Sequence, residues 1–151
     1  MAKKSKVGLK VPTANDMAKK YGSMIKLASE VTDTDLYIPS TFFALNYLFG
    51  KGIPYGKIVE IAGEESSGKS LVAYNFAYAT QQLGGHVIWV DAEQSWMNSW
   101  AEINGVDPAR VTIVNDTRIE YIADVVADLA IYLRSQLTHN EPILLVIDSI
   151  A

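Results

Sequence analysis

The chain contains no cysteine among its 151 residues, which excludes disulfide bonds and thiolate metal sites. It also lacks any run of about 18 apolar residues, the length that a membrane-spanning helix needs. The lysine-rich start is not followed by the apolar stretch of a secretory signal peptide. We therefore expect a soluble intracellular protein with no membrane partner.

Histidine is scarce too, with only two in the chain. Neither His86 nor His139 has candidate ligands near it in the sequence, so we expect both to be packing or surface residues. Disorder is excluded by the composition, because 49% of the residues are hydrophobic and 20% are charged. A chain of this length is expected to form one domain that buries about 68–70% of its unfolded surface.

Positive charge is concentrated at the start of the chain. Residues 1–26 hold seven lysines and a single acidic residue, Asp16, whereas the remainder holds six basic and sixteen acidic side chains. A basic segment on an acidic body can contact nucleic acid or the acidic face of a neighbouring subunit, or it can be a solvated tail. The sequence leaves these alternatives open.

Helical and strand patterns alternate along the chain. Branched apolar runs separated by helices indicate right-handed crossovers, and hence a parallel sheet with helices on both faces. The fold class is therefore α/β. Helices are expected at 15–30, at 40–50 with Ser40 or Thr41 as N-cap and Gly50 as the end, and at 69–83, 95–104 and 118–138; strands are expected at 57–62, 86–91, 111–114 and 143–148.

The strand expected at 143–148, "ILLVID", has five successive apolar residues. This pattern is typical of a strand that is buried on both faces of a sheet. Such a strand usually has a neighbouring strand on each side. We therefore expect residues 143–147 to be covered by helices on both faces.

A glycine-rich segment follows the first predicted strand of the main sheet. Its sequence, G-E-E-S-S-G-K-S, fits the phosphate-loop pattern G-x-x-x-x-G-K-[ST] in the required place between a strand and a helix. The backbone N–H groups and the positive end of the helix would hold phosphates, the lysine would contact the β- and γ-phosphates, and the last serine would bind Mg²⁺. The predicted loop consists of Gly63, Glu64, Glu65, Ser66, Ser67, Gly68, Lys69 and Ser70.

Two carboxylates lie where predicted strands end. Asp148 ends the strand 143–148, the position from which an aspartate orders the ligands of magnesium. Glu93 lies just after the strand 86–91, and from there it can orient and activate a water molecule. Because parallel strands end at one edge of a sheet, we expect both carboxylates beside the glycine loop.

Three segments together, "GIPYGKIVEIAGEESSGKS", "VIWVDAEQ" and "LLVIDSIA", closely resemble the nucleotide-binding core of the RecA family of recombinases. The resemblance runs from about Tyr37 to Ala151, with the motifs in the family's order. It implies a P-loop NTPase that uses ATP and Mg²⁺, with Glu93 and Lys69 as catalytic residues and Trp100 stacked on adenine. It also implies single-stranded DNA as partner, a homo-oligomeric filament, and the cytoplasm of a bacterial or phage-infected cell.

By the same resemblance, residues 1–35 would be a basic oligomerisation arm and residues 36–151 a RecA-like ATPase core. Three features depart from the family's pattern. Glu64 stands where bacterial members have proline, and Met97 stands where the family has an aspartate that binds adenine. The family's DNA-binding loops lie beyond the position of Ala151. We therefore expect the first part of a longer or split recombinase, whose C-terminal half can be supplied in trans.

Three functions are compatible with these residues. The first is ATP-dependent pairing and strand exchange of DNA, which "ESSGKS" together with "VDAE" favours. The second is another RecA-fold ATPase, such as a helicase or a clock-type protein. The third is a nucleotide-binding or filament-capping fragment without catalysis. Among the other tryptophans, Trp89 is expected in the core and Trp96 has no assigned role.

Overall fold

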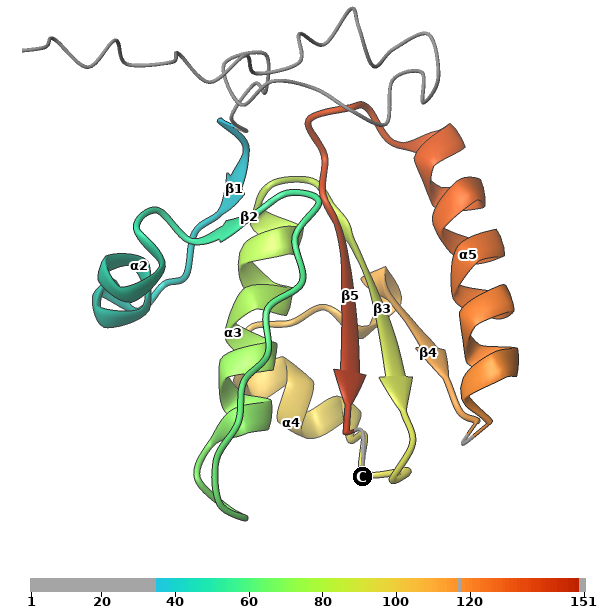
Figure 1. Ribbon diagram of the computed structural model, residues 1–151, viewed down its shortest axis with the longest axis horizontal. Helices are drawn as coiled ribbons and strands as arrows, with labels where there is room; N and C mark the ends of the chain where they lie inside the picture. The colour runs from blue at the N-terminus through green and yellow to red at the C-terminus, as the bar shows by residue number, and fades with distance from the viewer. Residues whose placement is uncertain (1–34, 117, 150–151) are drawn as a thin grey trace, which may run out of the picture. The chain divides into compact units, whose positions relative to one another are not determined.

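The computed structural model describes residues 35–116 and 118–149, and Figure 1 shows their arrangement. The helix expected at 15–30 and the proposed domain division at residue 35 involve residues outside this described part. The elements are, in order, β1 (Tyr37–Ile38), α2 (Phe43–Phe49), β2 (Ile53–Pro54), α3 (Lys69–Gln82), β3 (His86–Asp91), α4 (Asn98–Ile103), a 3₁₀ turn (Pro108–Arg110), β4 (Val111–Val114), α5 (Ile119–Gln136) and β5 (Ile143–Asp148).

The main sheet has three parallel strands in the order β4-β3-β5, which confirms the α/β class. The middle strand, β3, has four successive hydrophobic residues, Val87 to Val90, as expected for a strand with neighbours on both sides. Asp91 at its end lies opposite Asp148 at the end of β5. The carboxyl ends of these two strands therefore meet at one edge of the sheet.

Helices cover both faces of the sheet, as the sequence predicts (Figure 1). On one face, Val87 and Trp89 of β3 pack with Tyr74 and Ala77 of α3 and with Ala101 of α4. On the other face, the alternate residues of β3 and the end of β4 pack against α5; they are Ile88, Val90 and Val114, in contact with Ile122, Val125, Val126, Leu129, Ala130 and Leu133. The period of two along β3 thus divides its side chains between two cores.

A second, antiparallel pair of short strands, β1 and β2, flanks α2. The prediction that Ser40 or Thr41 caps α2 is wrong, because the helix begins at Phe43 without a side-chain cap. The Ser40 hydroxyl instead donates to Asn75 Oδ1 of α3 at 2.6 Å. The prediction that Gly50 ends the helix is confirmed, with φ at 85°.

The strand predicted at 57–62 is not formed. Ile58 in this segment is fully exposed, and neither sheet of the described residues includes any part of the segment. An extended chain becomes a strand only when a neighbour supplies a hydrogen-bonding ladder. Among the described strands, none forms such a ladder with residues 57–62.

The expectation that β5 is buried on both faces is also wrong in part. Leu145 and Ile147 remain 42% and 44% exposed. Ile143 of the same face packs against the α5 cluster, but α5 leaves the two later residues uncovered. Among the described residues β5 pairs only with β3, so it is an edge strand of this sheet.

The helix predicted at 95–104 is shorter than expected and spans Asn98–Ile103. The backbone N–H groups of Ser95 and Trp96 donate to the Asp91 carboxylate, which keeps this part of the chain in a turn. No helix within the described ranges has the length and apolar content needed to cross a membrane.

His86, at the start of β3, is half-buried and bonds through Nε2 to Thr112 Oγ1 at 2.9 Å. Burial, followed by the charge of Arg110, lowers the pKa of His86 below its ordinary value. The folded state therefore favours the neutral ring. The unfolded chain takes up a proton near its normal pKa of about 6.5, so stability should fall as the pH drops through that value.

We expect His86→Gln, which keeps a polar partner for Thr112, to reduce this pH dependence. Urea unfolding at about pH 7.5 and about pH 5.5 measures it, and the wild type should lose more stability than the variant, by less than about 1 kcal/mol. Equal losses in the two proteins would contradict the prediction.

Candidate functional site

The glycine loop 63–68 makes a tight turn directly before α3. A Cβ atom on Gly63 would lie 2.7 Å from Ser67 Oγ, so a larger residue would displace the Ser67 hydroxyl. Gly68 is the residue before α3 and has φ at 91°, a left-handed conformation that suits glycine. Ser66 also has a positive φ, 59°. The chain thus enters α3 with the first N–H groups of a helix of 14 residues beside the loop.

Lys69 folds back over this loop. Its Nζ donates to the backbone oxygen of Gly63 at 3.0 Å and to that of Glu64 at 2.7 Å. The ammonium group therefore lies against the loop backbone, where the sequence places a phosphate-binding charge. Phosphate oxygens are charged acceptors, and they bond an ammonium group more strongly than backbone carbonyls do.

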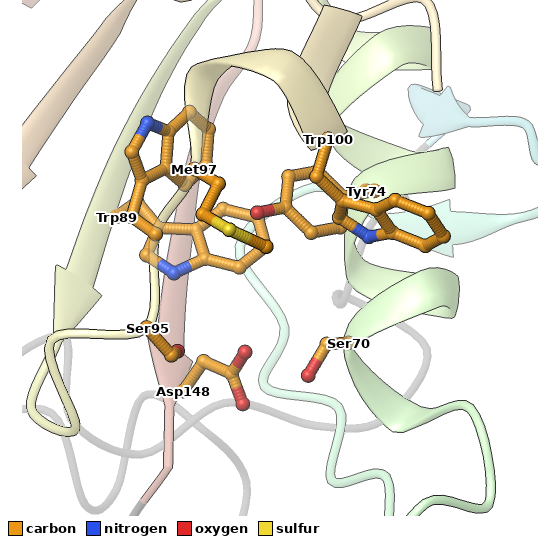
Figure 2. A pocket seen from close by; sticks show the side chains of 8 residues that line it. Ser70, Tyr74, Trp89, Ser95, Met97, Trp100 and Asp148 are labelled. Atoms are coloured by element: carbon orange, nitrogen blue, oxygen red, sulfur yellow. The ribbon is translucent and has the colours of Figure 1, made fainter. Parts of the chain in front are cut away.

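Ser70 and Asp148 border one cavity of about 400 Å³ (Figure 2). Ser70 comes from the first turn of α3 and Asp148 from the end of β5. In Figure 2 their oxygens lie along one side of the cavity, and aromatic side chains lie along the other. Magnesium takes hard oxygen ligands such as these and completes its shell with water and phosphate oxygens. Within the described residues no cluster of three His, Asp or Glu side chains could hold a metal by itself.

Three aromatic rings in mutual contact line the cavity. Tyr74 lies 4.7 Å from Trp89 and 5.3 Å from Trp96 between ring centroids, and the two tryptophans are 5.1 Å apart. The expectation that Trp89 belongs to the core is confirmed, since it is 2% exposed. The sequence analysis did not identify Tyr74 as a residue of the site and assigned no role to Trp96. The spacing could have identified Tyr74, because it lies one helical turn after Ser70 on the same face of α3.

The hydroxyl of Tyr74 stays protonated under physiological conditions. Burial raises its pKa to about 12, with smaller contributions from the negative charges of Asp148 and Asp91. A phenol in this state can donate a hydrogen bond beside the carboxylates. The cavity therefore combines an apolar wall with a neutral phenol that can donate a hydrogen bond.

Asp91 organises the turn that carries Glu93. It is 3% exposed, and its two oxygens accept hydrogen bonds from Ser95 N at 3.0 Å, Ser95 Oγ at 3.3 Å and Trp96 N at 2.9 Å. Gln94 within this turn has φ at 55°. Glu93 itself is exposed, and Ser149 Oγ donates to its Oε1 at 2.5 Å.

Met97 and Trp100 also border the cavity. They are 58% and 44% exposed, so both present apolar surface to solvent. The structure thus places Trp100 at the same cavity as Ser70 and Asp148. The loop side chains Glu64, Glu65, Ser66 and Ser67 are exposed and do not border this cavity.

Comparison with known proteins gives a match to the family model described as the RecA N-terminal domain, over residues 11–151. The chain belongs to the RecA family. It is 32% identical to Protein RecA of Gloeothece citriformis over 108 residues, which are 72% of this chain and 30% of that protein. It is 41% identical to Protein RecA of a Nocardioides species over 87 residues, which are 57% of this chain and 25% of that protein.

A longer match, to Protein RecA of Picosynechococcus, is 30% identical over 131 residues and covers 86% of this chain and 35% of the relative. The chain therefore spans about a quarter to a third of the length of these RecA relatives. The matched region of the family model includes the glycine loop and all three strands of the parallel sheet.

Proposed function

We propose that this chain is the ATP-binding part of a DNA recombinase of the RecA type, which pairs and exchanges DNA strands and hydrolyses ATP. The proposal rests on one observation. Ser70 and Asp148 border the same cavity, directly beside the glycine loop. Membership of the RecA family supports the same reading.

In this proposal different residues of the chain bind the phosphates, hold the metal ion and activate the water molecule. The loop N–H groups and Lys69 hold the β- and γ-phosphates, and Lys69 also stabilises the negative charge that develops during transfer. Ser70 and Asp148 hold Mg²⁺, which when bound neutralises charge on the phosphate oxygens. Glu93 accepts a proton from the attacking water as a general base.

The proposal assigns the nucleobase to Trp100. Its indole is 44% exposed and borders the cavity together with Met97, so both can cover a flat ring. Neither side chain here offers a strong hydrogen-bond acceptor that could distinguish adenine from guanine. We expect nucleotide binding to quench tryptophan fluorescence, and expect Trp100→Phe to lose most of that change.

Single-stranded DNA and a filament of identical subunits are the proposed partners. The described core has few basic groups, whereas residues 1–26 carry seven of the thirteen basic side chains. DNA binding and assembly would therefore depend on this basic segment and on further polypeptide of the recombinase.

The first experiment measures binding of Mg²⁺ and a fluorescent ATP analogue, and then ATP hydrolysis with and without single-stranded DNA. Lys69→Ala should weaken nucleotide binding at least about tenfold, because it removes a charged hydrogen-bond donor to phosphate.

DNA-stimulated turnover would support the recombinase proposal. Binding without turnover would favour a nucleotide-binding fragment, and ATP-driven duplex unwinding would favour a helicase. Absence of nucleotide binding would contradict the proposal.

A further inference from the structure

The residue that follows β5, Ser149, is bonded to the glutamate that follows β3. Its Oγ donates to Glu93 Oε1 at 2.5 Å, across 56 positions of sequence. Glu93 is exposed, and the described part of the structure records no other hydrogen bond or ion pair of its carboxylate. A single donor thus determines where this side chain lies.

Both partners of this bond follow backbone segments that hydrogen bonds hold in place. β3 and β5 pair along their full lengths, and Asp91 lies opposite Asp148 at the last position of the register. Ser149 is therefore placed by the strand that carries Asp148. The turn after β3 is held by the three hydrogen bonds to the buried Asp91, which places the backbone of Glu93.

We infer that Ser149 is a positioning residue for Glu93. The inference rests on the proposed function, in which Glu93 is the general base for water. An exposed glutamate ordinarily samples several rotamers, and holding one of them restricts its conformational entropy. The Ser149 hydroxyl holds Oε1 and leaves Oε2 free to accept the proton of a water molecule.

The same bond links the two carboxylates of the site. Asp148 and Ser149 are consecutive, so a shift of the end of β5 that moves the metal-binding carboxylate also moves the donor to Glu93. The position of the base is thereby tied to the strand that would hold the metal. The role of Ser149 could not be assigned from its own sequence neighbourhood.

The side-chain geometry can be measured without any turnover. Three-bond scalar couplings report the χ1 and χ2 rotamers of Glu93 in the isotope-labelled, nucleotide-free chain. We expect one dominant rotamer in the wild type, averaged couplings in Ser149→Ala, and restoration in Ser149→Thr, which keeps the hydroxyl. Averaged couplings in the wild type, or unchanged couplings in Ser149→Ala, would overturn the inference.

Kinetics then test the effect on the base. Ser149→Ala should lower kcat about tenfold with KM for ATP within about twofold, since the loss of a hydrogen bond to a charged group is of this order. Ser149→Thr should recover most of the loss, and Ser149→Ala should add nothing in a Glu93→Gln background. An equal loss in both backgrounds would assign Ser149 a purely structural role. If the wild type shows no turnover, the proposed function fails, while the couplings still decide whether Ser149 orders Glu93.

Discussion

Replacing Glu93 by glutamine is expected to lower ATP turnover at least about a hundredfold, the usual contribution of a general base. Glutamine keeps the size of the side chain and an oxygen that can accept the Ser149 hydrogen bond, but it cannot take a proton from water. Mg–ATP affinity should stay within about twofold, because the expected phosphate contacts come from the glycine loop and Lys69. The variant should therefore bind nucleotide and fail to hydrolyse it.

Steady-state hydrolysis and equilibrium binding of a fluorescent ATP analogue, measured on the same samples, test this separation. The matched control is Glu102→Gln, an exposed glutamate on α4 outside the lining of the cavity. It should leave both quantities unchanged. Turnover in Glu93→Gln close to that of the wild type would remove Glu93 from the proposed mechanism.

The second large effect concerns folding. Trp89→Ala is expected to destabilise the chain by about 3–5 kcal/mol, the range for removing a buried tryptophan. Trp89 lies on the central strand, is 2% exposed, and contacts the rings of Tyr74 and Trp96. Its loss would leave a cavity between the sheet and α3. Since small domains are stable by only about 5–15 kcal/mol, the variant should unfold at much lower urea concentration.

Far-UV circular dichroism during urea unfolding measures this change without relying on the tryptophan that is removed. Trp100→Ala, the same substitution at a side chain 44% exposed, provides the matched comparison and should cost much less. Trp89→Phe should lose less stability than Trp89→Ala, since a ring remains against Tyr74. Similar stabilities of Trp89→Ala and Trp100→Ala would show that the aromatic cluster is not the centre of the core.

Most elements could be predicted from local pattern. The strands at 86–91, 111–114 and 143–148 begin and end where the sequence places them, and α3 begins at Lys69 as expected. Runs of branched apolar residues and a glycine before a helix favour strands and turns through local backbone geometry, so a short segment of sequence is enough to predict them.

The predictions that failed depend on neighbours. Residues 57–62 have the composition of a strand but lie outside both sheets, and Leu145 and Ile147 have the pattern of a buried strand but are exposed. A sequence pattern indicates that a segment could pair as a strand or be buried. Whether another strand pairs with it, or a helix covers it, depends on the tertiary structure.

The sequence by itself determined the α/β class, the RecA-like loop from Gly63 to Ser70, and the positions of Glu93 and Asp148 at strand ends. These features follow from residue type and spacing within short segments. Only the tertiary structure decided that Ser149 bonds Glu93 and that Tyr74 and Trp96 line the cavity. These contacts join segments far apart in the chain, and they depend on the order and register of the strands, because only the assembled sheet brings such side chains within bonding distance.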